Sequence, residues 1–247
     1  MQSTGNTILI TGGGSGIGRA LAESFHALGN RVIIAGRRQA ALDETTRANP
    51  GMASLVLDIG DPQAIRRFAA QLTAAHPNLN VVVHNAGIMQ PEKILEAQDA
   101  VAEATIATNL LGPIRLTSAL LPHLSRQRHA AIMTVTSGLA FVPLAHFPTY
   151  SATKAALHSY TESLRTQLRD TSIQVLELAP PYVQTELTGA HQARDPDAMP
   201  LKEFIAETMQ ILANTPDAGE ILVERVKPLR FAQRNGNYET FYQNLNS

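Results

Sequence analysis

Short apolar runs recur along the chain, and longer segments with the spacing of amphipathic helices separate them. Continuous apolar runs of this length are typical of strands buried on both faces of a parallel sheet. The predicted strands are residues 7–11, 31–35, 53–57, 80–84, 130–136 and 172–178. The predicted helices are residues 16–28, 39–48, 62–76, an interrupted stretch at 98–124, and 150–169.

The regular alternation of strand and helix predicts how the elements connect. Parallel neighbours need a crossover connection of this length, and such crossovers are right-handed. We therefore expect an α/β fold in three layers, with a doubly wound parallel sheet between two layers of helices. The alternation stops near Pro180, residues 182–200 are loop-like, and helical patterns resume at 201–213 and 217–226. The polar tail that follows carries no clear pattern.

Length and composition indicate one globular domain. At 247 residues the chain is near the upper size of a single hydrophobic core, and no internal repeat or Ser/Gly-rich linker divides it. Apolar residues make up 44% of the chain and charged residues 17%, which is typical of a protein that buries a large interior. We expect residues 1–247 to form a single domain.

Charge and cysteine content exclude several functions. The 20 Lys and Arg against 21 Asp and Glu leave a formal charge of -1, without the basic excess that nucleic-acid binding requires. No cysteine is available for thiolate catalysis or metal ligation, and no His-Glu-x-x-His pair occurs, so we expect no metal site. No run approaches the roughly 18 apolar residues of a membrane span, and the amino end lacks a secretory pattern. We expect a cytoplasmic protein with neither a membrane nor a nucleic-acid partner.

A glycine-rich segment links the first predicted strand to the first predicted helix. Glycine is needed where the backbone takes a positive φ or approaches a ligand closely, and a helix N-terminus offers free N–H groups to a pyrophosphate. This context favours dinucleotide binding, with a tight strand-to-helix turn as the structural alternative. The candidate cofactor-binding residues are Gly12, Gly14, Ser15, Gly16, Ile17 and Gly18.

The end of the second predicted strand indicates which dinucleotide binds. A carboxylate there usually binds the adenosine ribose of NAD, but this chain has Arg37 and Arg38 after Gly36. A guanidinium can pair with a ribose 2′-phosphate, whereas a carboxylate would repel it. We therefore expect NADP(H) to be favoured over NAD(H). The alternative is that both arginines lie in a solvated loop.

Three polar residues are predicted to converge on the same edge of the sheet. Ser137 follows the fifth predicted strand, and Tyr150 and Lys154 stand four residues apart at the start of a helix, so they share one helical face. Ligands of open α/β sheets bind beyond the carboxyl ends of the strands, where the glycine loop also lies. Taken singly, each residue has a structural alternative, such as a strand cap, a half-buried aromatic or a solvated charge.

These motifs together resemble one protein family. Thr11-Gly12-x-x-x-Gly16-Ile17-Gly18, Asn85-Ala86-Gly87, Ser137 and Tyr150-x-x-x-Lys154, in this order, resemble the short-chain dehydrogenase/reductase family of single-domain Rossmann type. The resemblance covers about residues 7–185. Pro180-Pro181 and the carboxyl-terminal sequence resemble a subgroup described as DltE-like oxidoreductases, a description that establishes no substrate.

The resemblance implies a role for each matching residue. Tyr150 would be the general acid/base, Lys154 would lower its pKa and hold the nicotinamide ribose, and Ser137 would orient the substrate oxygen. These roles suit the reduction of a ketone, which leaves negative charge on an oxygen that needs donors and a proton. Asn109 would hold a water beside the lysine, and Asp58 would contact the adenine. The remaining implied cofactor contacts are Ile59, Asn85, Ala86, Gly87, Pro180, Val183 and Thr185.

The chain departs from the family pattern in two places. Pro181 stands where the family commonly has glycine, and because proline fixes φ, the loop leading to Thr185 must follow another path. The carboxyl end lacks the Asp-Gly-Gly signature of a seventh strand that commonly helps to build tetramers. We therefore expect that strand to be missing and the protein to be a homodimer formed through the catalytic-helix region.

Residues around the predicted site indicate the substrate class. Residues 138–147, between Ser137 and Tyr150, are largely apolar, as is Ile88-Met89, so we expect a small neutral or apolar carbonyl or alcohol. By analogy with the family, residues 182–213 would form a lid over the predicted site. The sequence thus predicts an NADP(H)-dependent oxidoreductase. The alternatives are a non-catalytic dinucleotide-binding regulator or scaffold, and an isomerase or dehydratase, which usually needs a larger substrate domain.

Overall fold

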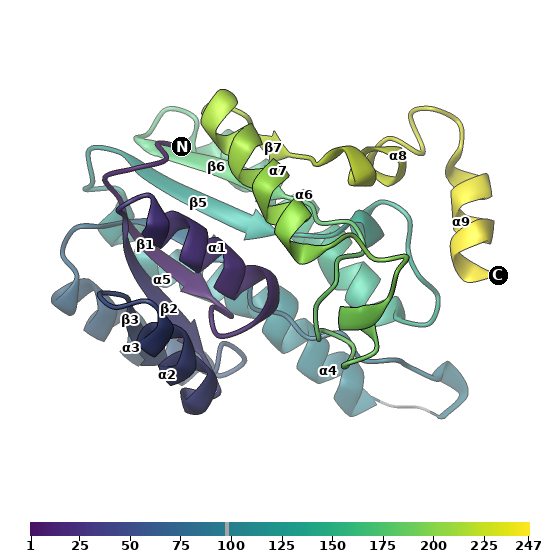
Figure 1. The fold of residues 1–247 in the computed structure, drawn as a ribbon, viewed down its shortest axis with the longest axis horizontal. Helices are drawn as coiled ribbons and strands as arrows, with labels where there is room; N and C mark the ends of the chain where they lie inside the picture. The colour runs from purple at the N-terminus through teal and green to yellow at the C-terminus, as the bar shows by residue number, and fades with distance from the viewer. Residues whose placement is uncertain (97–98) are drawn as a thin grey trace.

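The computed structural model describes residues 1–96 and 99–247, and its centre is one parallel sheet (Figure 1). The strand order is β3-β2-β1-β4-β5-β6-β7, so the chain builds outward from β1 in both directions. This order confirms the predicted doubly wound α/β fold. The strands are β1 Thr7–Thr11, β2 Arg31–Gly36, β3 Ala53–Val56, β4 Leu79–His84, β5 Ala130–Val135, β6 Ile173–Leu178 and β7 Glu220–Ile221.

Helices cover both faces of the sheet because alternate strand residues point to opposite sides. Ile8 and Ile10 of β1 belong to one buried cluster with residues of α1 (Gly16–Ala27), α2 (Gln39–Ala48) and α7 (Leu201–Asn214). Leu9 belongs to a second cluster, on the opposite face. The helices packed there are α3 (Pro62–Ala75), α5 (Gly112–Leu124) and α6 (Pro148–Leu168).

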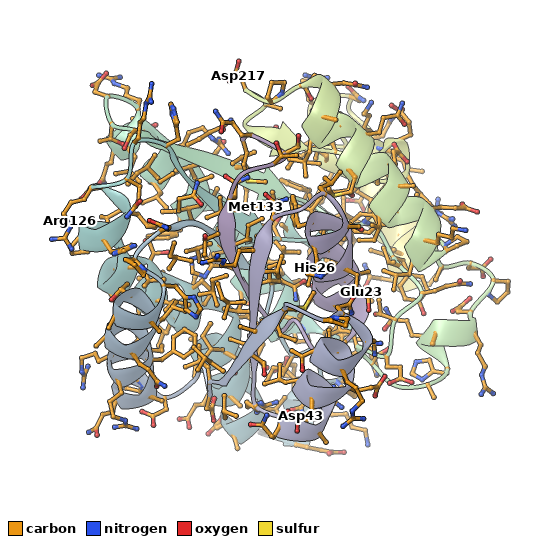
Figure 2. The ribbon with its side chains drawn as sticks, turned by 60° about the vertical axis from the view of Figure 1, so that its left-hand side comes forward. Glu23, His26, Asp43, Arg126, Met133 and Asp217 are labelled. Atoms are coloured by element: carbon orange, nitrogen blue, oxygen red, sulfur yellow. The ribbon has the colours of Figure 1, made fainter. Side chains whose placement is uncertain are left out.

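The central strands carry the apolar interior between these layers. Met133 of β5 has no exposed surface, and Figure 2 shows it inside the molecule. Arg126 and Asp217, labelled in the same view, project from the periphery. The near-continuous burial of β1 and β5 is the reason that their sequences read as unbroken apolar runs.

The interrupted helical stretch is divided by a π-helical turn. Its predicted start at residue 98 lies outside the described residues, and from residue 99 it forms α4 (Asp99–Ile106), a π turn (Ala107–Leu111) and α5. Such turns insert an extra residue into a helix and are frequent at functional sites.

Two predictions about the carboxyl-terminal region are wrong. Residues 217–226 do not form a helix; they contain β7 and a 3-10 turn (Glu224–Val226). The strand predicted to be missing is therefore present, with Glu220 beside Glu177 of β6 in a parallel pair. The sequence pattern predicted a helix because its buried apolar residues, Ile221, Val223 and Val226, follow one another at intervals of two and three residues. Such spacing fits a helix as well as a two-residue strand.

The remaining elements follow β7. They are α8 (Lys227–Arg230) and α9 (Tyr238–Asn246), and α9 lies away from the sheet in Figure 1. In the described residues no helix is both long and apolar enough to cross a membrane.

The predicted lid comprises a loop segment and a helix. Its helical part, α7, contributes Phe204 and Leu212 to the core and packs beside α1, so this part belongs to the body of the fold (Figure 1). Residues 182–200 contain only a short 3-10 turn and an isolated bridge between Val183 and Met199. Val183 and Met199, near the two ends of this segment, belong to the same buried cluster as Phe204.

Replacement of Phe204 tests whether α7 is part of the core. Phe204 has no exposed surface, so Phe204→Ala should lower the free energy of unfolding by about 3–5 kcal/mol, because it leaves a cavity in the α7–sheet contact. Chemical denaturation measures this change. Gln210→Ala, on the exposed side of α7, is the matched control and should change stability little. A loss of less than about 1 kcal/mol for Phe204→Ala would contradict core packing.

Candidate functional site

The glycine loop after β1 packs directly against the end of β4. Gly12 has a φ of +69°, and a Cβ there would lie 2.8 Å from Asn85 Nδ2. A Cβ on Gly18 would lie 2.3 Å from the same nitrogen and 2.3 Å from the Gly12 carbonyl oxygen. Real side chains do not approach this closely, so glycine is required at both positions for the loop to keep this path.

Hydrogen bonds between the ends of β1 and β4 hold the loop in place. The Asn85 amide donates to the Thr11 carbonyl oxygen at 3.0 Å. The Thr11 hydroxyl accepts from the backbone N–H of Asn85 at 3.0 Å and of Ala86 at 3.1 Å. Asn85 therefore positions the loop, while Ala86 and Gly87 line the neighbouring pocket. The contribution of Thr11 was not foreseen, because its partners lie more than 70 residues away in the sequence.

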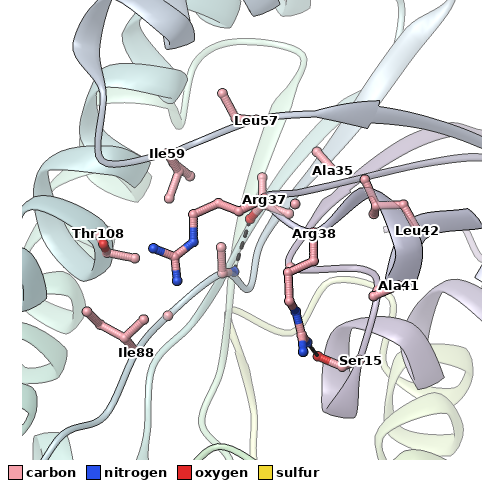
Figure 3. Close-up of a pocket in the computed structure, with 16 residues that line it drawn as sticks. Ser15, Ala35, Arg37, Arg38, Ala41, Leu42, Leu57, Ile59, Ile88 and Thr108 are labelled. Atoms are coloured by element: carbon pink, nitrogen blue, oxygen red, sulfur yellow. Dashed lines mark hydrogen bonds between the residues drawn. The ribbon is translucent and has the colours of Figure 1, made fainter.

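A pocket opens at the carboxyl ends of β1, β2 and β4 (Figure 3). The Arg37 guanidinium extends between Ile59, Ile88 and Thr108, whereas Arg38 turns toward the glycine loop. Arg38 donates to the Ser15 hydroxyl at 3.2 Å. The pocket also has lining residues that were not predicted to bind the cofactor, because most are small or apolar. They are Thr11, Ala35, Gly36, Ala41, Leu42, Leu57, Ile88 and Thr108.

The N-terminus of α1 faces the glycine loop and is not capped by a side chain. Ser15 has an extended backbone at the cap position, but its side chain makes no capping hydrogen bond to the helix. The first turn of α1 therefore keeps N–H groups that suit an anionic ligand. Gly16 has a φ of +52°, and a Cβ there would lie 3.5 Å from the Thr185 side chain. Ile17 packs against the hydrophobic core.

Two residues after β3 differ in their placement. Ile59 is buried and lines the pocket. Asp58 is exposed, does not line it, and accepts a hydrogen bond from the backbone N–H of Gly60 at 2.9 Å. In this structure Asp58 shapes the turn after β3.

Ser137, Tyr150 and Lys154 come together at the carboxyl end of β5. All three are buried, and the Ser137 hydroxyl accepts a hydrogen bond from the backbone N–H of Leu139 at 3.1 Å. The Lys154 ammonium donates to the Val135 carbonyl oxygen at 2.7 Å and lies 5.5 Å from the centre of the Tyr150 ring. The four-residue spacing along α6 brings the phenol and the amine to the same strand end.

Burial shifts the ionisation of both groups in this cluster. It raises the pKa of Tyr150 to about 12, although the neighbouring Ser137 hydroxyl acts in the opposite direction. Burial also lowers the pKa of Lys154 to about 8. At neutral pH the phenol is therefore protonated and the amine is charged. The arrangement holds a proton donor beside a cation in a site of low polarity.

Asn109 connects the π turn to both neighbouring elements. Its side-chain oxygen accepts from the Ile88 N–H at 2.9 Å, and its amide donates to the Ile88 carbonyl oxygen at 2.9 Å and to the Thr153 hydroxyl at 3.3 Å. A Cβ on Gly87 would lie 3.4 Å from the Asn109 oxygen and 3.8 Å from the Lys154 nitrogen. Asn109 thus lies near Lys154 and joins the segment after β4 to α6.

The segment after β6 lies beside both parts of the site. The Pro180 carbonyl oxygen accepts from the Gly138 N–H at 2.8 Å, next to Ser137. Val183 is buried, and the Thr185 hydroxyl accepts from the Gln192 amide at 3.1 Å. Gln192 also donates to the Val183 carbonyl oxygen at 2.8 Å and is 4% exposed. Sequence reasoning missed Gln192, because nothing in an isolated loop sequence indicates a buried amide.

Comparison with known proteins is consistent with this arrangement. The family model described as short chain dehydrogenase matches residues 6–196. Over 252 aligned residues the chain is 40% identical to the uncharacterized oxidoreductase DltE of Bacillus subtilis (strain 168), covering 100% of this chain and 99% of that protein.

Solved structures share the fold over nearly the whole chain. A short-chain dehydrogenase from Streptomyces avermitilis superposes with a TM-score of 0.84 at 26% identity, covering 97% of this chain and 96% of that one. The closed form of a serine dehydrogenase complexed with NADP+ superposes with a TM-score of 0.78 at 28% identity, covering 87% of this chain and 91% of that one. The family model and the relative, together with the glycine loop and the buried Ser137, Tyr150 and Lys154, identify the enzyme class: an oxidoreductase of CH–OH or C=O groups that uses a nicotinamide dinucleotide. The chain therefore belongs to the short-chain dehydrogenase family.

Proposed function

We propose that this enzyme uses NADP(H) to interconvert a carbonyl and a secondary alcohol on a small neutral or apolar substrate. The observation that carries the proposal is the buried group of Ser137, Tyr150 and Lys154 at the same sheet edge as the glycine loop. A non-catalytic regulator would not need a buried phenol and a buried amine, which cost free energy unless they have a use.

The residues at the sheet edge fit a dinucleotide. Gly12 and Gly18 leave no room for a Cβ, and the uncapped N-terminus of α1 suits a pyrophosphate. Ile59, Ala86 and Gly87 would line the binding cleft, and Lys154 and Asn109 would stand at its nicotinamide end, with Pro180, Val183 and Thr185 beside them. When bound, the dinucleotide supplies or accepts the hydride.

Tyr150 is the proton donor of the proposed reduction. Its phenol is protonated at neutral pH, because burial raises its pKa above the already high ordinary value. Proton transfer would leave a buried phenolate, which needs a positive charge nearby. Lys154, whose nitrogen lies 5.5 Å from the centre of the Tyr150 ring, would supply that charge. Ser137 would hold the substrate oxygen within reach of the phenol.

The preference for NADP(H) rests on Arg37 and Arg38. Both line the pocket, and within the described chain no carboxylate pairs with Arg37. A guanidinium without an anionic partner suits a phosphate. Arg38 is already directed at Ser15 in the glycine loop, so the two arginines border the pocket from different sides (Figure 3).

The substrate side of the site supports a neutral substrate. Residues 138–147 are largely apolar, and His146 packs edge-on against Phe147 as a wall residue, not a second catalyst. In this proposal residues 182–200 act as the lid.

The assembly and location of the protein are also proposals. We infer a homodimer formed through the region of α6, where Ile106 of the adjacent α4 is an exposed apolar side chain. We further infer a cytoplasmic location, supported by a sequence without cysteine, which suits a reducing compartment.

Replacement of Tyr150 tests the proton-donor role. Tyr150→Phe should lower kcat for carbonyl reduction by a factor on the order of 100–10,000, because the ring remains but the proton donor is lost. NADPH affinity, followed by fluorescence, should stay near the wild-type value. Tyr160→Phe, at a partly buried position on the same helix, is the matched control and should retain turnover. Turnover near the wild-type value in Tyr150→Phe would overturn the assignment.

The pH dependence of stability tests the state of Lys154. Its pKa is lowered from 10.5 to about 8 in the folded protein. Between these two pH values the unfolded chain binds more protons than the folded one, so the free energy of unfolding of the wild type should rise with pH. Relative to Lys154→Met the total rise should be roughly 2–3 kcal/mol. Denaturant unfolding at pH 7 to 11 measures the difference. Lys202→Met, at an exposed position of α7, controls for general effects of losing a lysine. A flat difference would show that Lys154 is not desolvated.

Charge reversal at the second strand tests the cofactor preference. The double replacement Arg37→Asp and Arg38→Asp should lower the ratio of kcat/KM for NADPH to that for NADH by a factor on the order of 100, because it removes charge-assisted hydrogen bonds to a phosphate. The single variants divide the effect between the two positions. Arg47→Asp, an exposed change on α2, controls for net charge. An unchanged ratio in the double variant would refute the preference.

A further inference from the structure

A buried carboxylate lies next to the catalytic strand end. Glu177 of β6 has no exposed surface. One of its oxygens accepts from the Thr136 hydroxyl at 2.7 Å, and the two oxygens lie 3.0 and 2.8 Å from the His158 Nδ1. Neither Glu177 nor His158 has a part in the proposed proton transfer, so their presence requires another explanation.

The fold directs these side chains to the same place. Thr134 of β5 and Thr136, two residues further along the chain, both point to the side of the sheet that α6 covers. Thr134 is paired with Glu177 in the register of β5 and β6, so the Glu177 side chain points to the same side. Tyr150, Lys154 and His158 follow at intervals of four along α6, so they share one helical face. The helix that places the phenol and the amine therefore also places an imidazole against Glu177.

The charge on Glu177 requires a partner. A carboxylate inside the sheet is costly unless it is paired and hydrogen-bonded. The hydrogen bond that the His158 Nδ1–H donates to Glu177 raises the pKa of His158, so the imidazole is charged at a higher pH than usual and supplies that partner. The other charged groups around His158 are Glu162 of α6, at 3.8 Å, Glu220 of β7 and Arg230 of α8.

The same cluster could be considered as a metal site. His158, Glu177 and Glu220 offer ligand atoms within 4.8 Å of one another. Arg230, however, donates to both oxygens of Glu220 at 2.7 and 3.2 Å. The charge of Glu220 is thus already matched by a cation of the chain itself, and the cluster is better explained as an internal network.

We propose that Glu177 and His158 are positioning residues that fix Thr136 and, through it, the adjacent Ser137 for the reaction. The inference rests on the proposed function. Successive residues at the end of β5 are each held: Val135 by Lys154, Thr136 by Glu177, and Gly138 by the Pro180 carbonyl. Ser137 lies within this series, and small displacements of a catalytic hydroxyl reduce rate strongly.

Replacement of Glu177 with its neutral analogue tests this link. Glu177→Gln keeps the size and an acceptor for Thr136 but removes the charge that holds His158, and it should lower kcat about 10-fold or more with little change in NADPH affinity. Thr136→Val, which removes only the hydroxyl, should act in the same direction and serves if Glu177→Gln folds poorly. Glu162→Gln, at a side chain 57% exposed, is the control and should keep wild-type turnover.

A double-mutant cycle separates positioning from general stability. In a Ser137→Ala background, Glu177→Gln should cause no further loss of kcat, because the hydroxyl that it positions is absent. Equal fold-losses in both backgrounds, or wild-type turnover in both Glu177→Gln and Thr136→Val, would overturn the proposal.

Two readouts need no substrate and separate this proposal from the proposed function. Nitrogen NMR of the His158 ring should show its pKa above the ordinary value in wild type and a fall in Glu177→Gln. Hydrogen exchange of residues 134–142 should accelerate in Glu177→Gln and not in Glu162→Gln. If Ser137→Ala keeps full turnover, the proposed function fails. The two readouts still decide whether Glu177 and His158 position the end of β5. An unchanged His158 titration or an unchanged exchange rate in Glu177→Gln would refute that positioning role.

Discussion

The carboxyl ends of β1, β4, β5 and β6 lie at one edge of the parallel sheet, and the site depends on the contacts among the segments that follow them. At this edge the glycine loop after β1 approaches the end of β4 so closely that a Cβ on Gly18 would lie 2.3 Å from Asn85 Nδ2. The end of β5 carries Ser137, and the segment after β6 accepts a hydrogen bond from Gly138. A shift of any one strand would separate groups that act together, because loops at a shared edge take their positions from the strands.

Polar groups are buried at this edge, and each has a partner that limits its motion. Lys154 donates to a strand carbonyl, Asn109 bonds both polar groups of the Ile88 backbone, and Glu177 holds Thr136 and His158. Burial is costly for such groups, but in a site of low polarity it also strengthens the interactions among them. The chemistry of Tyr150 follows from this setting, because the same burial keeps its phenol protonated and places a cation near it.

The fold was predictable from the sequence, with specific exceptions. The alternation of apolar strands and amphipathic helices predicted the doubly wound sheet, which the strand order confirms. The prediction was wrong at residues 217–226, because a two-residue strand is too short to show a period. The lid at residues 182–213 stays a prediction, and Phe204 within it is in the core. Around the site, the partners of Thr11 carried no local signal, nor did Gln192 or the Glu177–His158 pair, and Asp58 and Asn85 stand beside the pocket instead of lining it.

The sequence by itself determined the features that depend on near neighbours. Glycines at the end of β1 and the four-residue spacing of Tyr150 and Lys154 are local, so a strand, a loop and a helical face follow from them. The tertiary structure decided which distant partner each side chain meets: Thr11 with Asn85, Lys154 with Val135, and Glu177 with Thr136. These contacts join segments from 19 to 74 residues apart, and only the order and register of the strands brings such segments together.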